Sequence, residues 1–272
     1  MSIDWLAGEL RKALLAALQE LEIARDGLVL VSGIGQAAKM PHYIDASFFN
    51  GLHGRALPPA TAIKACNPEL TVIAVGGDGD MYGEGGNHLL HAARRNPDIT
   101  LFVHDNMVYG LTKGQAAPTS RPGMETPVQV FGVFAQPLNP VALAIALDVP
   151  FVARAFCGDI EQTKEVMKQA IRHKGFALVD IFQPCLSFNK VNTFQWFKDK
   201  TYTLPADYDP ADRAGAFRKA IEEEPFPLGI LYRHERRTTF EDSLQVYKKD
   251  NSPLFRRQVD MEKVEAEIQA MI

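Results

Sequence analysis

A carboxylate and a carboxamide each follow one of two neighbouring apolar segments of this sequence. Asp78 lies in the glycine-rich turn after the segment at 70–75, and Asn106 follows the segment at 99–103. Both segments are short, continuous and rich in β-branched residues, which is typical of buried strands. Carboxylate and amide oxygens are ligands that Mg²⁺ prefers, and a glycine turn before a helix suits a phosphate group. The pattern therefore indicates a site for Mg²⁺ and a diphosphate.

The elements between these residues would bring them together. We expect a helix at 85–95, so that the two strands are joined by a crossover and run parallel. Their carboxyl ends then lie side by side, at the edge where open parallel sheets bind ligands. Gly77 and Gly79 would let the backbone approach a diphosphate closely. A lone Gly-Asp-Gly is common in turns, but the flanking elements and Asn106 favour the functional interpretation.

Strand segments recur along the chain and alternate with helical patterns. The further strand segments lie at 28–32, 151–154, 177–181 and 228–232. This alternation predicts an α/β protein with a doubly wound, mostly parallel sheet and helices on both faces. Residues 1–190 would form the binding domain and residues 191–272 a C-terminal extension. The extension is aromatic at first and charged later, so it would either pack on another subunit or cover the sheet of its own chain.

Composition narrows the possible partners. A chain of 272 residues with 46% hydrophobic and 23% charged residues is an ordinary globular protein. Its net charge of −4 gives no reason to expect a nucleic acid or an anionic membrane as partner. No apolar run is long enough to span a membrane, and the N-terminus lacks a signal-peptide profile. The three cysteines are widely spaced, which fits reduced thiols. We therefore expect a cytoplasmic protein without a nucleic-acid or membrane partner.

Several blocks of the sequence resemble one protein family. Gly-Asp-Gly at 77–79 followed by Asn106 is similar to the thiamine-diphosphate motif. The more distinctive blocks are Ser-Gly-Ile-Gly at 32–35, Met-Pro-His-Tyr at 40–43, Leu-His-Gly-Arg-Ala at 52–56, the run at 105–115 that contains Tyr-Gly-Leu-Thr-Lys-Gly-Gln, and the late segment at 226–233. Together they resemble the β subunit, which binds thiamine diphosphate, of the 2-oxoacid:ferredoxin oxidoreductases. The similarity covers most of the chain, in order.

The resemblance implies the thiamine-diphosphate-binding fold and a set of site residues. Asp78, Asn106 and the main-chain carbonyl of Val108 would be the ligands of Mg²⁺. His53 would donate a hydrogen bond to the diphosphate. The residues expected to contact the cofactor are Gly35, His53, Arg55, Gly77, Asp78, Gly79, Asp80, Asn106, Tyr109, Gly110 and Leu111.

The resemblance also implies catalytic candidates on the substrate side, which are Lys39, Thr112 and Lys113. A 2-oxo acid needs its carboxylate held, and a lysine supplies the opposite charge. Taken alone, both lysines would be interpreted as solvated surface residues, and His53 and Arg55 as ordinary loop residues. Two of the blocks are similar to the branch of the family that handles 2-oxoglutarate and pyruvate.

The chain is expected to need a second subunit as partner. Activation of thiamine diphosphate requires a carboxylate against its aminopyrimidine ring, and in the family this Glu belongs to the pyrimidine-binding domain of the α subunit. Nothing in the sequence resembles a second thiamine domain. The resemblance therefore implies a heterodimer with an α subunit. It also implies a 2-oxo acid, coenzyme A, and ferredoxin or another electron acceptor.

The sequence departs from the family at its cysteines. Relatives begin with Trp-Cys-Pro-Gly-Cys-Gly, whereas this chain has Leu6 and Glu9 at the two cysteine positions. Gln36 stands at the third family cysteine, and Cys185 keeps the fourth. A [4Fe-4S] cluster is held by four thiolates, so we predict no such cluster in this chain. The remaining cysteines, expected as buried core thiols, are Cys66 and Cys157.

Three functional hypotheses remain. The first is oxidative decarboxylation of a 2-oxo acid to an acyl-CoA, with electrons leaving through a cluster or flavin in a partner subunit. The second is a non-redox thiamine enzyme, a 2-oxoacid decarboxylase or a carboligase. The third is a scaffold subunit that retains only the fold. The presence of both Asp78 and Asn106 argues against the third, because a scaffold has no need of metal ligands.

Overall fold

One mixed sheet organises the chain. The computed structural model describes the backbone of residues 3–272 and the side chains from residue 8 onward. The sheet has eight strands in the order β2-β1-β3-β4-β6-β5-β8-β7. The strands are β1 (Leu28–Ser32), β2 (Ser47–Asn50), β3 (Thr71–Gly77), β4 (Thr100–Asp105), β5 (Phe151–Phe156), β6 (Ala177–Phe182), β7 (Thr201–Thr203) and β8 (Phe226–Arg233). The strands β1 to β6 run parallel, whereas β8 is antiparallel to β5 and β7 is parallel to β8. The predicted α/β class with a mostly parallel sheet is confirmed.

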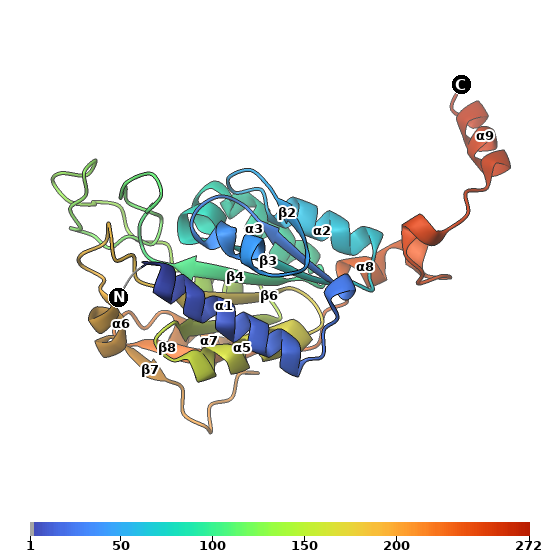
Figure 1. Cartoon of the computed structure of the whole chain (residues 1–272). Helices are drawn as coiled ribbons and strands as arrows, with labels where there is room; N and C mark the ends of the chain where they lie inside the picture. The colour runs from blue at the N-terminus through green and yellow to red at the C-terminus, as the bar shows by residue number, and fades with distance from the viewer. Residues whose placement is uncertain (1–2) are drawn as a thin grey trace.

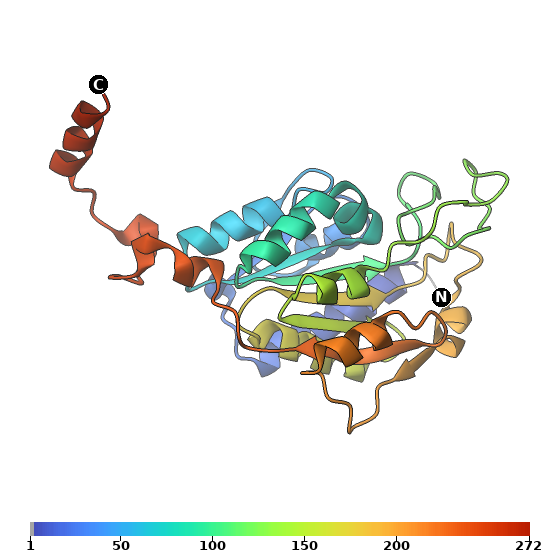
Figure 2. The same ribbon diagram turned by 180° about the vertical axis from the view of Figure 1, so that it is seen from behind.

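Helices cover both faces of this sheet. The helices are α1 (Ile3–Glu20), α2 (Leu57–Cys66), α3 (Gly86–Arg95), α4 (Pro140–Ala146), α5 (Ile160–Arg172), α6 (Phe194–Asp199), α7 (Arg213–Ala220), α8 (Phe240–Ser243) and α9 (Met261–Ala270). One face carries α1 and α5, which pack against each other (Figure 1). The other face carries α2, α3, α4 and α7 (Figure 2). The sheet is therefore doubly wound, as predicted.

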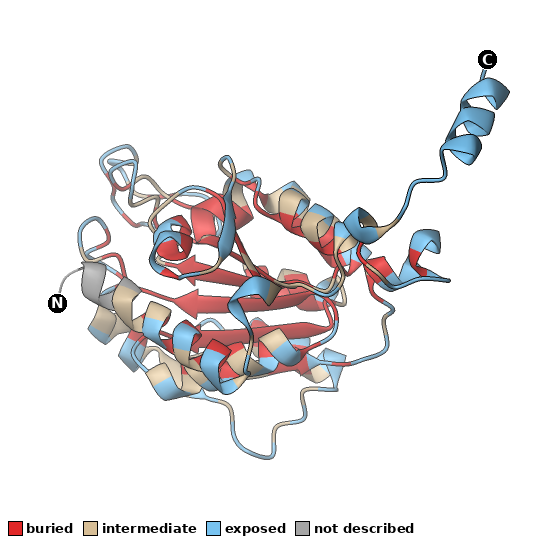
Figure 3. Ribbon diagram, turned by 45° about the vertical axis from the view of Figure 1, so that its right-hand side comes forward, coloured by how far each residue is buried: buried red, intermediate tan, exposed pale blue. Residues whose placement is uncertain are grey.

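The central strands are mostly apolar because both of their sides are covered. Leu30 and Phe102 belong to the core under α1 and α5. Their chain neighbours Val31 and Leu101 belong to the core under α2 and α3. Every residue of β4, β5 and β6 is buried (Figure 3). Strands buried on two faces appear as continuous apolar runs rather than alternating ones, which is why these segments could be recognised in the sequence.

Two strands and one turn have no continuous apolar run by which they could be recognised in the sequence. The edge strand β2 pairs with β1, yet all of its residues are exposed. The strand β7 has only the three residues Thr201–Thr203. The segment Gly79–Glu84 forms a π-helical turn between β3 and α3. Such turns are rare and occur often at functional sites.

The chain beyond residue 190 contributes to its own sheet before it leaves the body of the molecule. The strand β8 pairs with β5, and its residues Leu231 and Tyr232 are fully buried. All residues of α9 are exposed, and α9 projects from the end of the molecule opposite the long loop 106–139 (Figure 1). The predicted domain boundary at residue 190 and the predicted contact of the extension with another subunit stay predictions.

Two smaller observations concern cysteines and membranes. Cys157 is buried as expected, but Cys66 is exposed, because it is the last residue of α2 and not part of the core. The expectation of a buried Cys66 was therefore wrong. Within the described part of the chain, no helix combines the length and the apolar character needed to cross a bilayer.

Candidate active site

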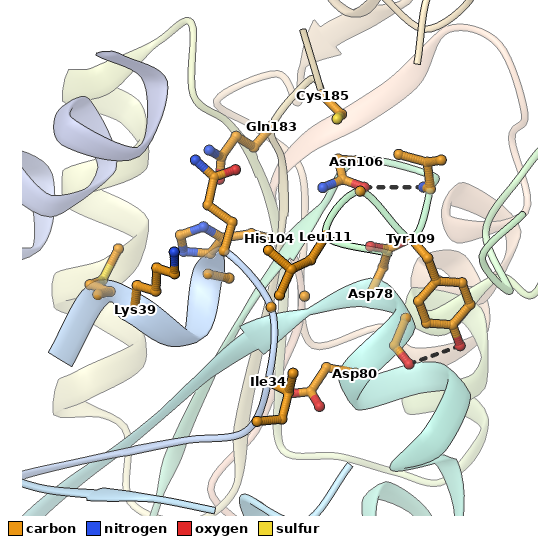
Figure 4. Close-up of a pocket in the computed structure, with 18 of the residues that line it drawn as sticks. Ile34, Lys39, Asp78, Asp80, His104, Asn106, Tyr109, Leu111, Gln183 and Cys185 are labelled. Carbon is orange, nitrogen blue, oxygen red and sulfur yellow. Dashed lines mark hydrogen bonds between the residues drawn. The ribbon is translucent and has the colours of Figure 1, made fainter. Parts of the chain in front are cut away.

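A cavity of about 660 Å³ lies at the carboxyl ends of the central parallel strands. Its walls come from the segments that follow β1, β3, β4 and β6 (Figure 4). Parallel α/β sheets bind ligands at this edge. The predicted site residues that line the cavity are Gly35, Lys39, His53, Gly77, Asp78, Gly79, Asp80, Asn106, Val108, Tyr109, Gly110, Leu111 and Thr112. Residues that are far apart in the sequence thus meet at one cavity.

Asp78 is the buried acid at the base of this cavity. It is 1% exposed and precedes the π-helical turn. Its Oδ2 accepts a hydrogen bond of 2.5 Å from the hydroxyl of Thr119. Burial raises the pKa of Asp78 to about 6, and the hydroxyl of Thr119 and the main-chain N–H groups of Gly79 and Asn106 oppose this shift. A cation at Asp78 would favour the ionised carboxylate that burial disfavours.

Asn106 closes a short turn that presents further oxygen atoms. Its Oδ1 accepts a hydrogen bond from the N–H of Val108 at 3.1 Å, and its carbonyl accepts one from Asn189 at 3.0 Å. Met107, between Asn106 and Val108, has a φ of 57°. This left-handed residue reverses the chain, so Asn106 and Val108 both line the cavity with Asp78.

These residues fit Mg²⁺ that is also held by a diphosphate. The potential donors are a carboxylate, an amide oxygen and a main-chain carbonyl, all hard oxygen ligands. Within the described residues, no cluster of three or more His, Cys, Asp or Glu side chains is arranged to hold a metal. A cation here would therefore need further oxygens from a phosphate group or water, as Mg²⁺ usually does.

Additional buried carboxylates lie behind Asp78. Burial raises the pKa of Asp105 well above its usual value, and the charges of Asp78 and Asp180 raise it further. Asp180 accepts hydrogen bonds from the hydroxyl of Tyr82 at 2.8 Å and from Nε of Arg154 at 3.1 Å. Of these three acids, Asp180 is the one with an arginine contact among the described residues, so the region has an excess of negative charge that a divalent cation would offset.

Thr119 connects two of these acids. Its hydroxyl lies 2.5 Å from Oδ2 of Asp78 and 3.1 Å from Oδ1 of Asp105. A hydroxyl has one proton to donate and lone pairs that accept. The shorter of the two contacts is to Asp78, while burial and the charges of Asp78 and Asp180 raise the pKa of Asp105. The hydroxyl of Thr119 therefore links the acid that lines the cavity to the acid buried behind it.

Tyr109 packs on the glycine turn. Its hydroxyl donates to the carbonyl of Gly79 at 3.2 Å (Figure 4). A Cβ atom on Gly79 would lie 2.2 Å from the Tyr109 ring, and one on Gly83 would lie 2.3 Å from the hydroxyl. Glycine at both positions is therefore required by the close contact with Tyr109. The predicted approach of a diphosphate to Gly77 and Gly79 stays a prediction.

Asp80 joins the turn to the loops that follow β1 and β2. Its Oδ1 accepts a hydrogen bond of 2.7 Å from the N–H of Gly54 and lies 3.5 Å from Nδ1 of His53. A Cβ atom on Gly33 would be 2.2 Å from its Oδ2. Burial raises the pKa of Asp80, and the N–H groups of Gly54 and Ile34 oppose the shift. Asp80 therefore lies next to His53 at the cavity wall.

Two predicted residues do not reach the cavity. Arg55 donates to the carbonyls of Glu84 at 3.3 Å and of His53 at 3.5 Å, outside the lining. Lys113 is exposed, has a φ of 85° and lies outside the lining as well. Thr112 and Lys39 do line the cavity. The roles of Arg55 and Lys113 stay predictions that this arrangement of the single chain does not support.

The cavity also contains residues that sequence reasoning missed. His104 is 3% exposed, and burial lowers its pKa to about 4, with partial opposition from the side chain of Gln183. Arg11 from α1 and Gln183 after β6 are further lining residues. A histidine inside the apolar run of β4 was the signal that could have identified His104, since polar residues are rare in strands buried on both faces.

Two of the four positions at which the family has cluster cysteines line the same cavity. Gln36 and Cys185 both line it. Glu9 pairs with Lys12 at 2.7 Å on the surface of α1. The side chain of Leu6 lies outside the part of the chain that the structure describes. Cys185 is a free thiol.

Comparisons with known proteins agree with this geometry. The family described as thiamine pyrophosphate enzyme, C-terminal TPP binding domain, matches residues 29–181. The family that describes the C-terminal part of the pyruvate ferredoxin oxidoreductase β subunit matches residues 185–249. The fold and the site therefore define a domain that binds thiamine diphosphate.

Related proteins specify the family. The chain is 40% identical over 270 residues to the β subunit of 2-oxoacid:ferredoxin oxidoreductase 1 of Aeropyrum pernix, which covers 92% of this chain and 85% of the relative. It is 41% identical over 259 residues to the corresponding subunit of Saccharolobus solfataricus, covering 89% and 85%. A solved structure of 2-oxoglutarate:ferredoxin oxidoreductase from Magnetococcus marinus, with 2-oxoglutarate, coenzyme A and succinyl-CoA bound, superposes with a TM-score of 0.90 at 34% identity. That comparison covers 96% of this chain and 89% of the other. This chain belongs to the family of β subunits of the 2-oxoacid:ferredoxin oxidoreductases.

Proposed function

We propose that this chain binds thiamine diphosphate through Mg²⁺ and that, together with an α subunit, it performs oxidative decarboxylation of a 2-oxo acid to an acyl-CoA. The observation that carries this proposal is the convergence of Asp78, Asn106 and Val108 on one cavity in front of two further buried acids, Asp105 and Asp180. An Mg²⁺ ion would offset this excess negative charge and bridge to the diphosphate. The relative from Magnetococcus marinus was solved with 2-oxoglutarate and coenzyme A bound, which supports the same substrate classes here.

Different residues of the cavity would bind the metal, the diphosphate and the substrate. Asp78, Asn106 and the carbonyl of Val108 hold the metal and so fix the diphosphate. His53, which lies beside Asp80, donates a hydrogen bond to the diphosphate. Lys39 lies on the side of the cavity opposite Asp78 in Figure 4, and it holds the carboxylate of the 2-oxo acid. When bound, thiamine diphosphate supplies the electron sink for decarboxylation.

The site is completed by the α subunit. Among the described residues that line the cavity, the acidic ones are Asp78 and Asp80. Asp78 is bound by Thr119, and Asp80 is bound by Gly54. In this proposal Asp78 serves the metal and Asp80 stays beside His53, so neither contacts the aminopyrimidine ring. The carboxylate that activates the cofactor therefore comes from the α subunit, and the β chain alone is inactive.

Electrons leave this site without a [4Fe-4S] cluster in this chain. Gln36 and Cys185 both line the cavity, and glutamine does not supply a thiolate. The electrons then pass to a cluster or flavin in a partner subunit, and from there to ferredoxin or another acceptor. Iron and acid-labile sulfide should be measured in this chain after anaerobic purification from its partner. We expect iron near zero; stoichiometric iron and sulfide would contradict this part of the proposal.

The product distribution tests the reaction itself. The purified αβ complex is supplied with 2-oxoglutarate or pyruvate and coenzyme A, with and without an artificial one-electron acceptor such as methyl viologen. We expect acyl-CoA and reduced viologen to form together, and no sustained product without the acceptor. Aldehyde or carboligation products formed without any acceptor would instead support a non-redox decarboxylase or carboligase, for which the replaced cysteines are the motivating observation.

A further inference from the structure

His104 is a buried polar residue that the proposed metal and diphosphate site does not use. It lies near the end of β4, is 3% exposed and lines the cavity. By hydrogen-bond geometry neither of its ring nitrogens has a partner among the described residues, although the side chain of Gln183 lies near enough to oppose the lowering of its pKa. Leaving buried polar atoms unpaired is costly because their desolvation is not compensated, and native proteins rarely do so. A ligand in the cavity is the natural partner for this ring.

The sheet leaves the imidazole open toward the cavity. His104 pairs in register with Gly77 on β3 and with Ile181 on β6. Side chains of paired residues point to the same face of a sheet. Gly77 has no side chain to cover the ring, and Ile181 has no polar atom to bind it. The neighbouring strands therefore cannot satisfy His104.

The surroundings of His104 are rich in hydrogen-bond donors. Lys39, Gln36 and Gln183 line the same cavity, and Figure 4 shows Lys39, His104 and Gln183 on the side away from Asp80 and Tyr109. The cavity acids Asp78 and Asp80 already accept hydrogen bonds from Thr119 and Gly54. A ligand at the donor-rich side must therefore bring acceptors, and a carboxylate brings acceptors only.

We propose that His104 donates a hydrogen bond to the carboxylate of the bound 2-oxo acid, beside Lys39. This inference rests on the proposed function, because it takes a 2-oxo acid as the substrate. An imidazole provides at least one N–H donor in either protonation state, and Lys39 provides the charge. The hydrogen bond would orient the substrate so that its 2-oxo carbon faces the cofactor. His104 is then a substrate-binding residue and not a ligand of the cofactor.

Two substitutions in the αβ complex test this role. His104→Phe keeps a ring but removes both nitrogens, and His104→Gln keeps an N–H donor. His173→Gln is the matched control, since His173 is 8% exposed and packs against Phe151 away from the cavity. The KM and kcat for 2-oxoglutarate and for pyruvate are measured with coenzyme A and methyl viologen. The Kd of thiamine diphosphate with Mg²⁺ is measured by calorimetry on the same samples.

We expect His104→Phe to raise KM for the 2-oxo acid roughly 10- to 100-fold, the loss that one hydrogen bond to a charged group corresponds to. The Kd of the cofactor should stay within about twofold, and the control should match the wild type. His104→Gln should lie between the two. An unchanged KM in both His104 variants would overturn the inference. A matching loss of cofactor affinity would overturn it as well, because His104 would then serve the cofactor.

The design separates this inference from the proposed function. A wild-type complex that bound no thiamine diphosphate would contradict the proposed function and this inference with it. A complex that bound the cofactor and turned over substrate, with a KM insensitive to His104, would contradict only this inference. If His104→Phe failed to fold, His104→Gln would decide, and a KM equal to that of the wild type would count against the role.

Discussion

At the scale of single residues, the site depends on close contacts that only certain side chains permit. Gly79 meets the ring of Tyr109, and Gly33 meets Asp80, at distances that leave no room for a Cβ atom. The sequence indicated that glycine was important at the turn. It could not show that Gly79 is required because Tyr109, thirty positions later, packs against it. That contact depends on how the loop after β4 folds back.

A substitution at Gly79 tests this packing. Gly79→Ala should displace the Tyr109 ring, since the new Cβ would lie 2.2 Å from it. We expect cofactor affinity in the αβ complex to fall at least about tenfold, roughly 1.4 kcal/mol. Gly86→Ala is the control, because a Cβ there meets nothing within 4 Å. If Gly79→Ala bound the cofactor as tightly as the control, the contact between Gly79 and Tyr109 would not be needed for cofactor binding. The double variant Gly79→Ala with Tyr109→Ala should recover part of the lost affinity.

A second residue-scale prediction concerns the hydroxyl between the buried acids. Thr119→Val keeps the shape but removes the hydrogen bonds to Asp78 and Asp105. We expect the free energy of unfolding of the metal-free chain to fall by about 1–3 kcal/mol, because a buried acceptor loses its donor. Urea denaturation gives the value, and Thr119→Ser should stay close to the wild type. Equal stability of the valine and serine variants would contradict the bridging role.

At the scale of elements, the sequence predicted what apolar periodicity encodes. The strands β3 and β4 and the helix α3 were recognisable, and their parallel arrangement placed Asp78 and Asn106 at one edge. The exposed strand β2 and the π-helical turn at Gly79–Glu84 were not. An exposed edge strand has no apolar run, and a π-helical turn has no simple periodicity. What the sequence left open was therefore the detailed shape of the loops that line the cavity.

The end of α5 offers a prediction about pH. His173 caps this helix, and burial lowers its pKa from 6.5 to about 4. Between these pH values the unfolded chain binds more protons at this residue than the folded chain, so stability rises with pH across this window and is lost as pH falls. His173→Gln should reduce the slope of unfolding free energy against pH by up to about 1.4 kcal/mol per pH unit. Urea titrations between pH 4 and 6.5 measure it, and an unchanged slope would argue against a buried neutral His173.

At the scale of the whole molecule, the cavity separates two kinds of chemistry. Buried acids and the turn around Asn106 occupy one side, and Lys39 with His104 occupies the other (Figure 4). The loop 106–139 stands at this end, whereas α9 projects from the opposite end (Figure 2). Under the proposed function, a partner that supplies the catalytic carboxylate would approach the cavity end, away from α9.

The central claim is that Asp78 binds Mg²⁺ and thereby holds thiamine diphosphate. It is tested most directly by calorimetric titration of the αβ complex with thiamine diphosphate, with and without Mg²⁺, for the wild type and Asp78→Ala. Asp45→Ala is the control, because Asp45 forms an exposed ion pair with Arg25 away from the cavity. We predict Mg²⁺-dependent binding by the wild type and the control, and a loss of more than roughly 100-fold in Asp78→Ala. Wild-type affinity in Asp78→Ala would contradict the account.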